Sequence, residues 1–309
     1  MVALLWQKSS FVLQSKIMTH ELSFEDFPIL KSKHVYIKDK KRLLRILNTI
    51  LRDGCKSLQI VTDFDLTLTK QHVNGKKVLS SFGMFGKCKQ LSLTYTEESH
   101  RLYDMYRPIE IDPHLPLETK AEAMTNWIIA AEEILKGIPF NPDEILEVAK
   151  TYGMNLRDHT EELFKKLYSA GIPILVFSAG LGDIVEAILR ERGVLFDNVK
   201  VISNFLEYKD GKLAGFKNEK LIHVFNKNEY AIEQEHLNVL EGRKNVLLMG
   251  DTIGDASMVD GMGEINAVLK IGFLYDNAET SLRSYMEEYD IVLVDDQTMQ
   301  IPIDILRIL

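Results

Sequence analysis

The chain has 309 residues, of which 46% are hydrophobic and 27% are charged. This is the composition of a globular protein, and the length suits one large domain or two modest ones. The 37 basic and 45 acidic residues give a formal net charge of −8, which provides no general attraction for nucleic acid or anionic lipid. We therefore expect neither a nucleic acid polymer nor a membrane as a partner.

The cysteine content indicates a reducing compartment, and the hydropathy pattern predicts no membrane span. Cys55 and Cys88 are the two cysteines, too few for a disulfide framework, so free thiols are expected. No run of about 18 apolar residues exists that could span a bilayer. Residues 1–16 mix short apolar stretches with lysines and contain no acid, which suits either a weak targeting signal or a frayed terminus. We expect a cytoplasmic monomer.

Strand and helix patterns alternate along most of the chain. Residues 35–52 have apolar residues at helical spacing, and Asp53-Gly54 ends this amphipathic stretch. Apolar runs bounded by turn residues then predict buried parallel strands at 58–62, 173–177, 199–203, 245–249, 267–272 and 290–294. Amphipathic helices are predicted at 157–169, 183–192, 230–240 and 279–288. The alternation predicts an α/β fold with a doubly wound, mostly parallel sheet.

One long insertion interrupts this alternation. Residues 70–154 contain helical patterns at 94–106, 117–135 and 143–151 but no convincing apolar strand, and Asn141-Pro142 resembles a helix cap followed by a first-turn proline. We interpret 70–154 as a helical cap domain above the carboxyl ends of the strands, and 1–69 with 155–309 as the core domain. Within the core, Asp210-Gly211 in segment 205–217 predicts a β-hairpin.

Two carboxylates, Asp63 and Asp65, directly follow the first predicted strand. Side chains two residues apart on an extended segment share a face. Open α/β sheets bind ligands at the carboxyl ends of their strands, so both acids are expected to enter one crevice. A polar turn is the alternative for this motif taken alone.

A second pair of acids, Asp251 and Asp255, follows the strand predicted at 245–249. Asp251 could bind a divalent cation together with Asp63, because Mg²⁺ takes one or two protein carboxylates along with phosphate and water oxygens. Asp255 could orient a bound water, or it could cap a helix that begins near Ala256.

A hydroxyl group and a lysine complete the set of candidate residues. The strand predicted at 173–177 ends in Ser178-Ala179-Gly180, whose small side chains let a phosphate oxygen approach the backbone. A serine at a strand end is common without such a role. Lys227 supplies a possible fixed positive charge, and Lys217 and Lys220 are rival candidates.

Taken together, these residues suit phosphoryl transfer, which needs a nucleophile, in-line geometry and positive charge around the equatorial oxygens. Asp63 would attack phosphorus and become an aspartyl phosphate. Asp65 would protonate the leaving alkoxide and then activate water, and Thr67 could orient its neighbours. A non-catalytic module that carries phosphoaspartate as a signal is the alternative, although it would need neither the second acid nor a lid.

At these residues the chain resembles the haloacid dehalogenase-like phosphatases, whose pattern is DxDx[TV], a strand-end Ser or Thr, a Lys and paired acids. The sequence around the motifs resembles more narrowly the cytosolic 5′-nucleotidase III family of pyrimidine and 7-methylguanosine monophosphate nucleotidases. Segments 58–65, 176–180, 215–217, 221–227 and 289–294 carry this resemblance, which covers roughly residues 58–309. It implies a nucleotide substrate and Mg²⁺ held by Asp63, Asp251 and the backbone oxygen of Asp65.

The same resemblance implies further roles. Ser178, Ala179 and Lys227 would hold phosphate, and Glu110 in segment 109–113 would contact the nucleobase, although an exposed acid at a helix end is the simpler interpretation of Glu110. The cap departs from the family, with Ile128 in place of an aromatic residue, Ala131 in place of a serine and Phe82-Gly83 in place of a polar pair. The choice among CMP, UMP, 7-methylguanosine monophosphate and another small phosphate monoester therefore stays open, as does phosphate transfer to a nucleoside.

Overall fold

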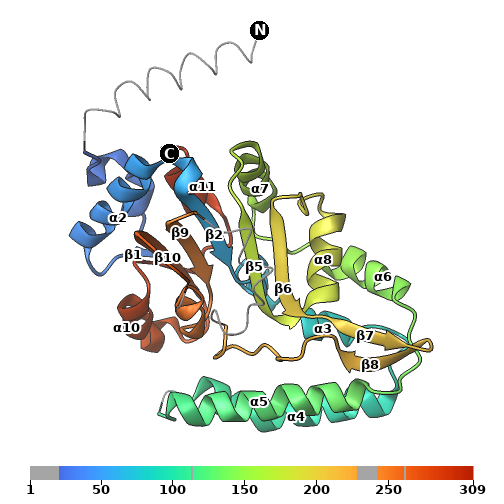
Figure 1. Ribbon diagram of the computed structural model, residues 1–309. Coiled ribbons are helices and arrows are strands. Elements are labelled where there is room, and N and C mark those ends of the chain that lie inside the picture. Colours follow the sequence, from blue (N-terminus) through green and yellow to red (C-terminus); the bar gives the residue numbers. More distant parts are fainter. Residues whose placement is uncertain (1–20, 113, 228–241, 261, 309) are drawn as a thin grey trace.

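The computed structural model describes residues 21–112, 114–227, 242–260 and 262–308. Within them, seven strands form the central sheet in the order β1-β11-β10-β9-β2-β5-β6 (Figure 1). Neighbouring strands from β11 to β6 run parallel, whereas β1 at the edge pairs antiparallel with β11. The predicted α/β fold with a mostly parallel, doubly wound sheet is confirmed.

The strands lie where the apolar runs predict them, with small shifts at their ends. Their bounds are β2 Leu58–Thr62, β5 Ile174–Leu181, β6 Val199–Asn204, β9 Asn245–Gly250, β10 Ala267–Leu274 and β11 Ile291–Val294. β5 continues past residue 177, and its register with β6 shifts between Phe177 and Leu181. This irregularity brings Ser178 and Gly180 to the crevice at the end of the strand.

The helices of the core begin and end at recognisable signals. α2 (Lys40–Asp53) begins after Asp39, whose carboxylate accepts the amide hydrogens of Lys41 and Arg42, and it ends at Gly54 with φ 72°. Residues 35 and 36 instead form β1 (Val35–Tyr36), which corrects the prediction of one continuous amphipathic stretch at 35–52. Only the long-range pairing with β11 makes these two residues a strand.

The other core helices are α7 Thr160–Ser169, α8 Gly182–Glu191, α10 Ala278–Glu288 and α11 Gln300–Leu306. The helix predicted at 230–240 and the N-terminal segment 1–16 lie outside the described residues. No helix in the described part of the chain is both long and apolar enough to cross a membrane.

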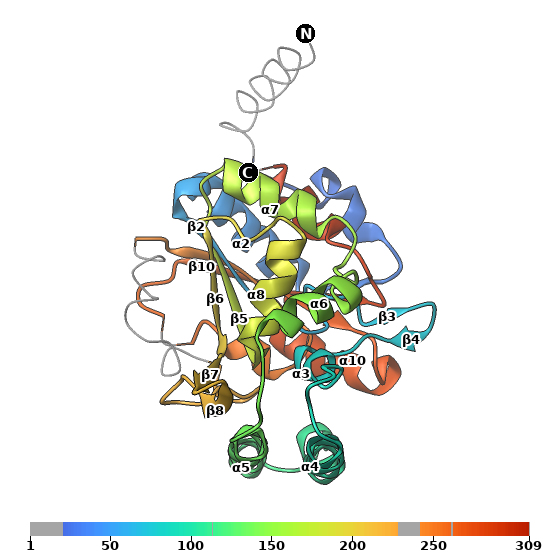
Figure 2. The ribbon, with the colours of Figure 1, turned by 90° about the vertical axis from the view of Figure 1, so that its right-hand side faces the viewer.

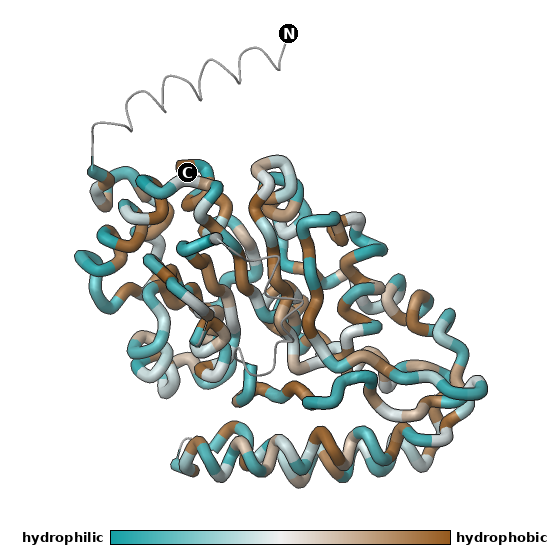
Figure 3. The backbone as a smooth tube through the Cα atoms, in the orientation of Figure 1, coloured by the Kyte–Doolittle hydropathy of each residue, from teal (hydrophilic) through white to brown (hydrophobic). Residues whose placement is uncertain are grey.

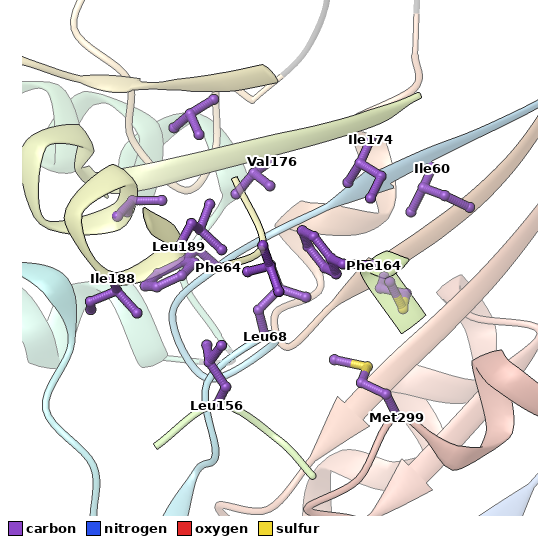
Figure 4. Close-up of a cluster of buried hydrophobic side chains, with 14 of the residues drawn as sticks. Ile60, Phe64, Leu68, Leu156, Phe164, Ile174, Val176, Ile188, Leu189 and Met299 are labelled. Carbon is purple, nitrogen blue, oxygen red and sulfur yellow. The ribbon is translucent and has the colours of Figure 1, made fainter. Parts of the chain in front are cut away.

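Apolar side chains cover both faces of the sheet. In β2, Ile60 packs into one buried cluster and Val61 into another, because successive side chains point to opposite faces. Figure 4 shows the first cluster, in which Ile60, Phe64 and Phe164 lie among side chains from β5 and α8. The brown strands in the centre of Figure 3 mark the same core.

The inserted stretch has two parts that pack differently. Its elements are β3 His72–Val73, β4 Lys76–Lys77, α3 Ser81–Phe85, α4 Leu93–Ile111, α5 Leu117–Leu135 and α6 Asp143–Tyr152. α3 and α6 contact α8 of the core, whereas α4 and α5 pack against each other as a pair set apart from the sheet (Figures 1 and 2). α4 runs beyond its predicted end at 106, through Pro108 to Ile111. The two-residue strands β3 and β4 are too short and polar to show an apolar run.

The chain leaves and re-enters the core at adjacent points. The amide of Lys70 donates to the carbonyl of Asn155 at 2.7 Å, and Thr69 forms an antiparallel bridge with Leu156. These contacts support domain boundaries near residues 70 and 154, which stay a prediction.

The predicted β-hairpin is confirmed and touches the insertion. It consists of β7 (Leu206–Lys209) and β8 (Lys212–Phe216), and Asp210 and Gly211 in its turn have φ of 51° and 73°. The amide of Gly137, just after α5, donates to the carbonyl of Leu213 at 2.8 Å. The hairpin therefore attaches the C-terminal end of α5 to the core.

Candidate active site

The carboxylates that follow β2 and β9 meet at one edge of the sheet. The two strands are neighbours, and the amide of Asp63 donates to the carbonyl of Met249 at 3.0 Å. Asp63, Asp251 and Asp255 each offer an oxygen atom, and these atoms lie within 4.8 Å of one another. Asp63 and Asp251 therefore lie as close together as a shared cation site requires.

Phe64 explains why Asp63 and Asp65 point the same way. Its side chain has no exposed surface and packs into the first apolar cluster (Figure 4). Since neighbouring side chains on an extended segment alternate in direction, the burial of Phe64 turns both carboxylates toward the crevice. The alternative of a solvated polar turn does not hold, because Asp63 is only 4% exposed.

Arg157 holds the loop that follows these acids, and sequence reasoning missed it. It is 1% exposed and donates to the carbonyls of Leu66 and Thr67, at 2.6 Å each. Leu66 has φ 62°, so the loop is held in a left-handed bend. Thr67 then donates to Asp251 at 3.3 Å, which is the orienting contact expected of it.

Lys227 links two of these acids, Asp63 and Asp255. Its ammonium donates to Asp63 and, at 2.7 Å, to Asp255, and its side chain is 2% exposed. Burial by itself lowers the pKa of Lys227, but the carboxylates of Asp255 and Asp63 outweigh burial and raise that pKa. Lys217 and Lys220, the rival candidates, are exposed.

Asp255, which the sequence predicts to orient a bound water or to cap a helix, also binds Lys227 and Thr252. It is fully buried, it binds Lys227, and it accepts hydrogen bonds from the amide and hydroxyl of Thr252 at 2.9 and 2.8 Å. A side chain at position 250 would leave a Cβ only 2.3 Å from that of Asp255, so Gly250 is required. Asp255 thus braces both the lysine and the loop after β9.

Asp65 is held by Ser81, the first residue of α3. The Ser81 hydroxyl donates to one Asp65 oxygen at 2.6 Å and the Ser81 amide donates to the other at 2.7 Å. A Cβ on Gly180, at the end of β5, would lie 2.0 Å from the Ser81 hydroxyl and 2.7 Å from Asp65. Sequence reasoning could not find Ser81, because nothing local distinguishes it from Ser80.

Ser178 and Ala179 lie beside this acid, at the end of β5. Ser178 is 1% exposed, and its hydroxyl oxygen accepts the amide hydrogen of Gly180 at 3.0 Å. The carbonyl of Ala179 accepts from Asn204 at 3.1 Å. A Cβ on Gly180 would lie 3.1 Å from the Ser178 hydroxyl and 2.7 Å from Asp65, so the predicted strand-end serine lies close to Asp65.

The crevice holds more negative than positive charge. Burial raises the pKa of Asp63, Asp65 and Asp251, and Lys227 opposes that rise at all three. Neighbouring carboxylates raise the pKa of Asp63 and Asp251 further. Buried carboxylate oxygens this close together are hard donors that suit a small divalent cation, so the residues fit Mg²⁺.

The cap places Glu110 in an ion pair. Arg107, one turn earlier on α4, donates to the Glu110 carboxylate at 2.6 Å, and the Glu110 side chain is 12% exposed. Burial lowers the pKa of Arg107, but Glu110 and, more weakly, Asp251 of the core outweigh burial and raise it. Glu110 is therefore held by Arg107 and is not the freely exposed helix-end acid of the simpler interpretation.

Most aromatic residues of the cap pack against other residues of the protein. Trp127 stacks on Tyr106 with ring centroids 5.8 Å apart and an interplanar angle of 12°. Phe85 is fully buried, and Ile128 is 7% exposed within the large apolar cluster. Phe82 is half-buried, and its ring makes an edge contact with Phe216.

Comparison with known protein families identifies the family to which this chain belongs. The family model described as "Pyrimidine 5'-nucleotidase (UMPH-1)" matches residues 66–309. The chain belongs to this family. It is therefore a 5′-nucleotidase, a phosphoric monoester hydrolase.

Individual relatives agree with this assignment. The chain is 44% identical over 291 residues to the 7-methylguanosine phosphate-specific 5′-nucleotidase of Drosophila melanogaster, covering 93% of this chain and 91% of the relative. The human protein of the same name is 37% identical over 279 residues, covering 90% and 93%. A crystal structure of cytosolic 5′-nucleotidase IIIB bound to cytidine superposes with a TM-score of 0.90 at 44% identity, covering 93% of this chain and 97% of that one.

Proposed function

We propose that this 5′-nucleotidase hydrolyses CMP, UMP or 7-methylguanosine monophosphate to nucleoside and phosphate, with Mg²⁺, through an aspartyl phosphate on Asp63. The observation that carries the proposal is the group of Asp63, Asp251 and Asp255, whose oxygens lie within 4.8 Å of one another, together with the buried Lys227, which pairs with Asp63 and Asp255. Such an arrangement brings together a nucleophile, a cation site and a fixed positive charge.

Asp63, Asp251 and the backbone oxygen of Asp65 would hold Mg²⁺. The ion supplies positive charge beside the transferring phosphoryl group and the carboxylates. Lys227, whose ammonium donates to Asp63, would add a second positive charge. Asp255 keeps Lys227 in place through their 2.7 Å hydrogen bond.

The protein groups carry out the reaction in two steps. Asp63 forms a bond to phosphorus as the ester bond to the nucleoside breaks, and the leaving alkoxide takes the proton of Asp65. Asp65 then removes a proton from a water molecule, whose oxygen attacks phosphorus and releases phosphate from Asp63. Ser178 and the backbone at Ala179 would bind the phosphate oxygens during both steps.

Glu110 is the proposed contact for the base. A carboxylate only accepts hydrogen bonds, so it favours bases with donors on the pairing edge, such as the cytosine amino group or the N1 and amino hydrogens of 7-methylguanine. Uracil presents one donor between two carbonyls, so CMP is expected to be a better substrate than UMP. The names of the relatives and the cytidine bound to one of them support this substrate class.

A substrate screen tests the proposal. CMP, UMP, 7-methylguanosine monophosphate and a sugar phosphate would be compared for phosphate release with Mg²⁺ and with EDTA, on wild type and on Glu110→Gln. We expect the nucleotides to lead, EDTA to abolish turnover, and Glu110→Gln to reduce the preference for CMP over UMP. A sugar phosphate turned over faster than every nucleotide would favour the alternative, a phosphatase of another small phosphate monoester.

The location and assembly of the protein are also proposals. A cytoplasmic location is supported by the word "cytosolic" in the name of the 44%-identical structure. The expected monomer stays a prediction, which a light-scattering mass would check.

A further inference from the structure

Ser81 makes an unusual double contact with Asp65. Its hydroxyl donates to Asp65 Oδ2 at 2.6 Å and its amide donates to Oδ1 at 2.7 Å, so one residue holds both carboxyl oxygens. Ser81 has no exposed surface, which keeps water from competing for these contacts. It belongs to α3, in the inserted stretch and not in the loop that carries Asp65.

The direction of the Ser81 hydroxyl hydrogen follows from a third contact. The Ser81 oxygen accepts the amide hydrogen of Leu181, at the end of β5, at 3.0 Å. A hydroxyl has a single hydrogen, and in this arrangement it points at Asp65. The central sheet therefore orients Ser81, and Ser81 in turn orients the carboxyl group of Asp65.

Little free space surrounds this chain of hydrogen bonds. A Cβ at position 180 would lie 2.0 Å from the Ser81 oxygen and 2.7 Å from Asp65 Oδ2, so only glycine leaves room for the contact. α3 packs directly on β5, so the contact between Ser81 and Asp65 lies where these two elements meet.

The double contact leaves Asp65 able to transfer a proton. A carboxylate offers about four acceptor positions, and a protonated carboxyl group keeps acceptor capacity beside its own hydrogen. Ser81 occupies two positions, one on each oxygen, so a position remains for the proton that passes to the leaving group. Proton transfer requires the donor within hydrogen-bond reach of the acceptor, and that distance depends on the carboxyl orientation.

We propose that Ser81 is a positioning residue for proton transfer, which holds the carboxyl group of Asp65 at the angle needed to protonate the leaving nucleoside. This inference rests on the role proposed above for Asp65. One hydroxyl group therefore contacts both the acid and the end of β5.

The test compares Ser81→Ala with Ser80→Ala. Ser80 is exposed and its hydroxyl accepts the amide hydrogen of Gly83 at 3.2 Å, so it caps the same helix and does not touch Asp65. Single-turnover rates would be measured for nucleoside release from CMP, which needs a proton, and for nitrophenolate release from p-nitrophenyl phosphate, whose leaving anion needs none.

We expect Ser81→Ala to slow the first release of nucleoside by about 10- to 100-fold, a part of the ~10²–10⁴-fold that general acid catalysis contributes. The first release of nitrophenolate should change less than about threefold, and the KM for CMP should stay close to that of wild type. Ser80→Ala should lower the melting temperature slightly and leave both rates within about twofold. Equal slowing of both releases by Ser81→Ala, or no slowing of either, would overturn the inference.

Two further variants keep the result interpretable. Ser81→Cys has nearly the same shape but a weak S–H donor, so it should give an intermediate nucleoside rate, and it replaces Ser81→Ala in the test if that variant does not fold. Asp65→Asn tests the role of Asp65 as the proton donor separately from the role of Ser81 in positioning it. If Asp65→Asn shows the leaving-group selectivity and the Ser81 variants do not, only the role of Ser81 is wrong; if Asp65→Asn shows none, the proposed role of Asp65 fails.

Discussion

The core and cap sides of the active site are held in different ways. On the core side, Asp63, Asp255 and Lys227 form a network whose side chains are 6%, 1% and 2% exposed. On the cap side, Glu110 and Arg107 pair with each other, and their side chains are 12% and 38% exposed. A buried charge network is costly to change at any single residue, whereas a partly exposed pair is worth little. The reaction is therefore expected to depend on the buried core network, with Ser81 of α3 beside it, and the choice of base on the pair in α4.

The largest effect is expected for Asp63→Asn. An amide neither attacks phosphorus effectively nor supplies a carboxylate to Mg²⁺, so phosphate release should fall at least ~10³-fold, a scale typical of removing a nucleophile. Asp104→Asn, at an exposed position of α4, is the matched control and should keep wild-type activity. Near-normal turnover of Asp63→Asn would remove the basis for assigning the chemistry to the core.

Lys227→Met is expected to have the next largest effect. It removes the positive charge beside Asp63 and leaves two buried carboxylates without their partner, so kcat/KM for CMP should fall ~10²–10³-fold. The protein should also lose stability in EDTA, measured by thermal melting, because an uncompensated buried charge is costly. Lys217→Met and Lys220→Met serve as controls, and a larger loss in either one would transfer the catalytic role to that lysine.

Changes at Glu110 should be smaller and should affect the substrate order. Replacing the carboxylate by an amide in Glu110→Gln should change the CMP-to-UMP ratio of kcat/KM by about fivefold, which corresponds to ~1 kcal/mol for one partly exposed hydrogen bond. The kcat for the better substrate should change little. An unchanged ratio would show that Glu110 does not read the base, and a large loss of kcat would contradict the separation of core and cap roles.

The smallest effect is expected for a change at His223, which contacts the cap from the core. His223, in the segment that leads to Lys227, lies with Nε2 3.1 Å from the hydroxyl of Thr125 on α5, and burial lowers its pKa to about 4. Its Nδ1 accepts the amide hydrogen of Phe225 at 3.2 Å, so the neutral ring carries its proton on Nε2.

Protonation of His223 should therefore weaken the folded state in a defined pH range. The unfolded chain binds this proton with a pKa near 6.5 and the folded chain only near 4. The unfolded state holds more protons between these values, so stability falls as the pH drops from about 6.5 toward 4. Melting temperatures of wild type and His223→Asn should converge over this range. A constant difference from pH 7 to 4.5 would show that His223 does not titrate there.

Local patterns were sufficient to predict the core strands and the acids at their ends. Residues 58–62 and 245–249 are continuous apolar runs followed at once by Asp63 and Asp251. Parallel strands present their carboxyl ends at one edge of the sheet, so the meeting of these two acids follows from chain direction alone. The bounds of α5 (Leu117–Leu135) were equally predictable, because its apolar spacing is regular.

Contacts between distant segments could not be predicted in the same way. β1 becomes a strand only by pairing with β11, and Arg157 reaches the carbonyl of Thr67 across 90 positions. Ser80 and Ser81 look alike in the sequence, yet only Ser81 reaches Asp65, because α3 is seated against β5.

The sequence by itself determined the sheet, the strand-end acids and the class of chemistry, since these depend on hydropathy period and chain direction. The residue pattern left three candidate lysines and the family resemblance favoured Lys227. The tertiary structure shows the reason, because Lys227 reaches Asp63 across 164 positions while Lys217 and Lys220 stay exposed. The physical reason is that a lysine has no local signature for its partner. Its role is decided by which carboxylates remain within reach once the surrounding elements have packed and water has been excluded.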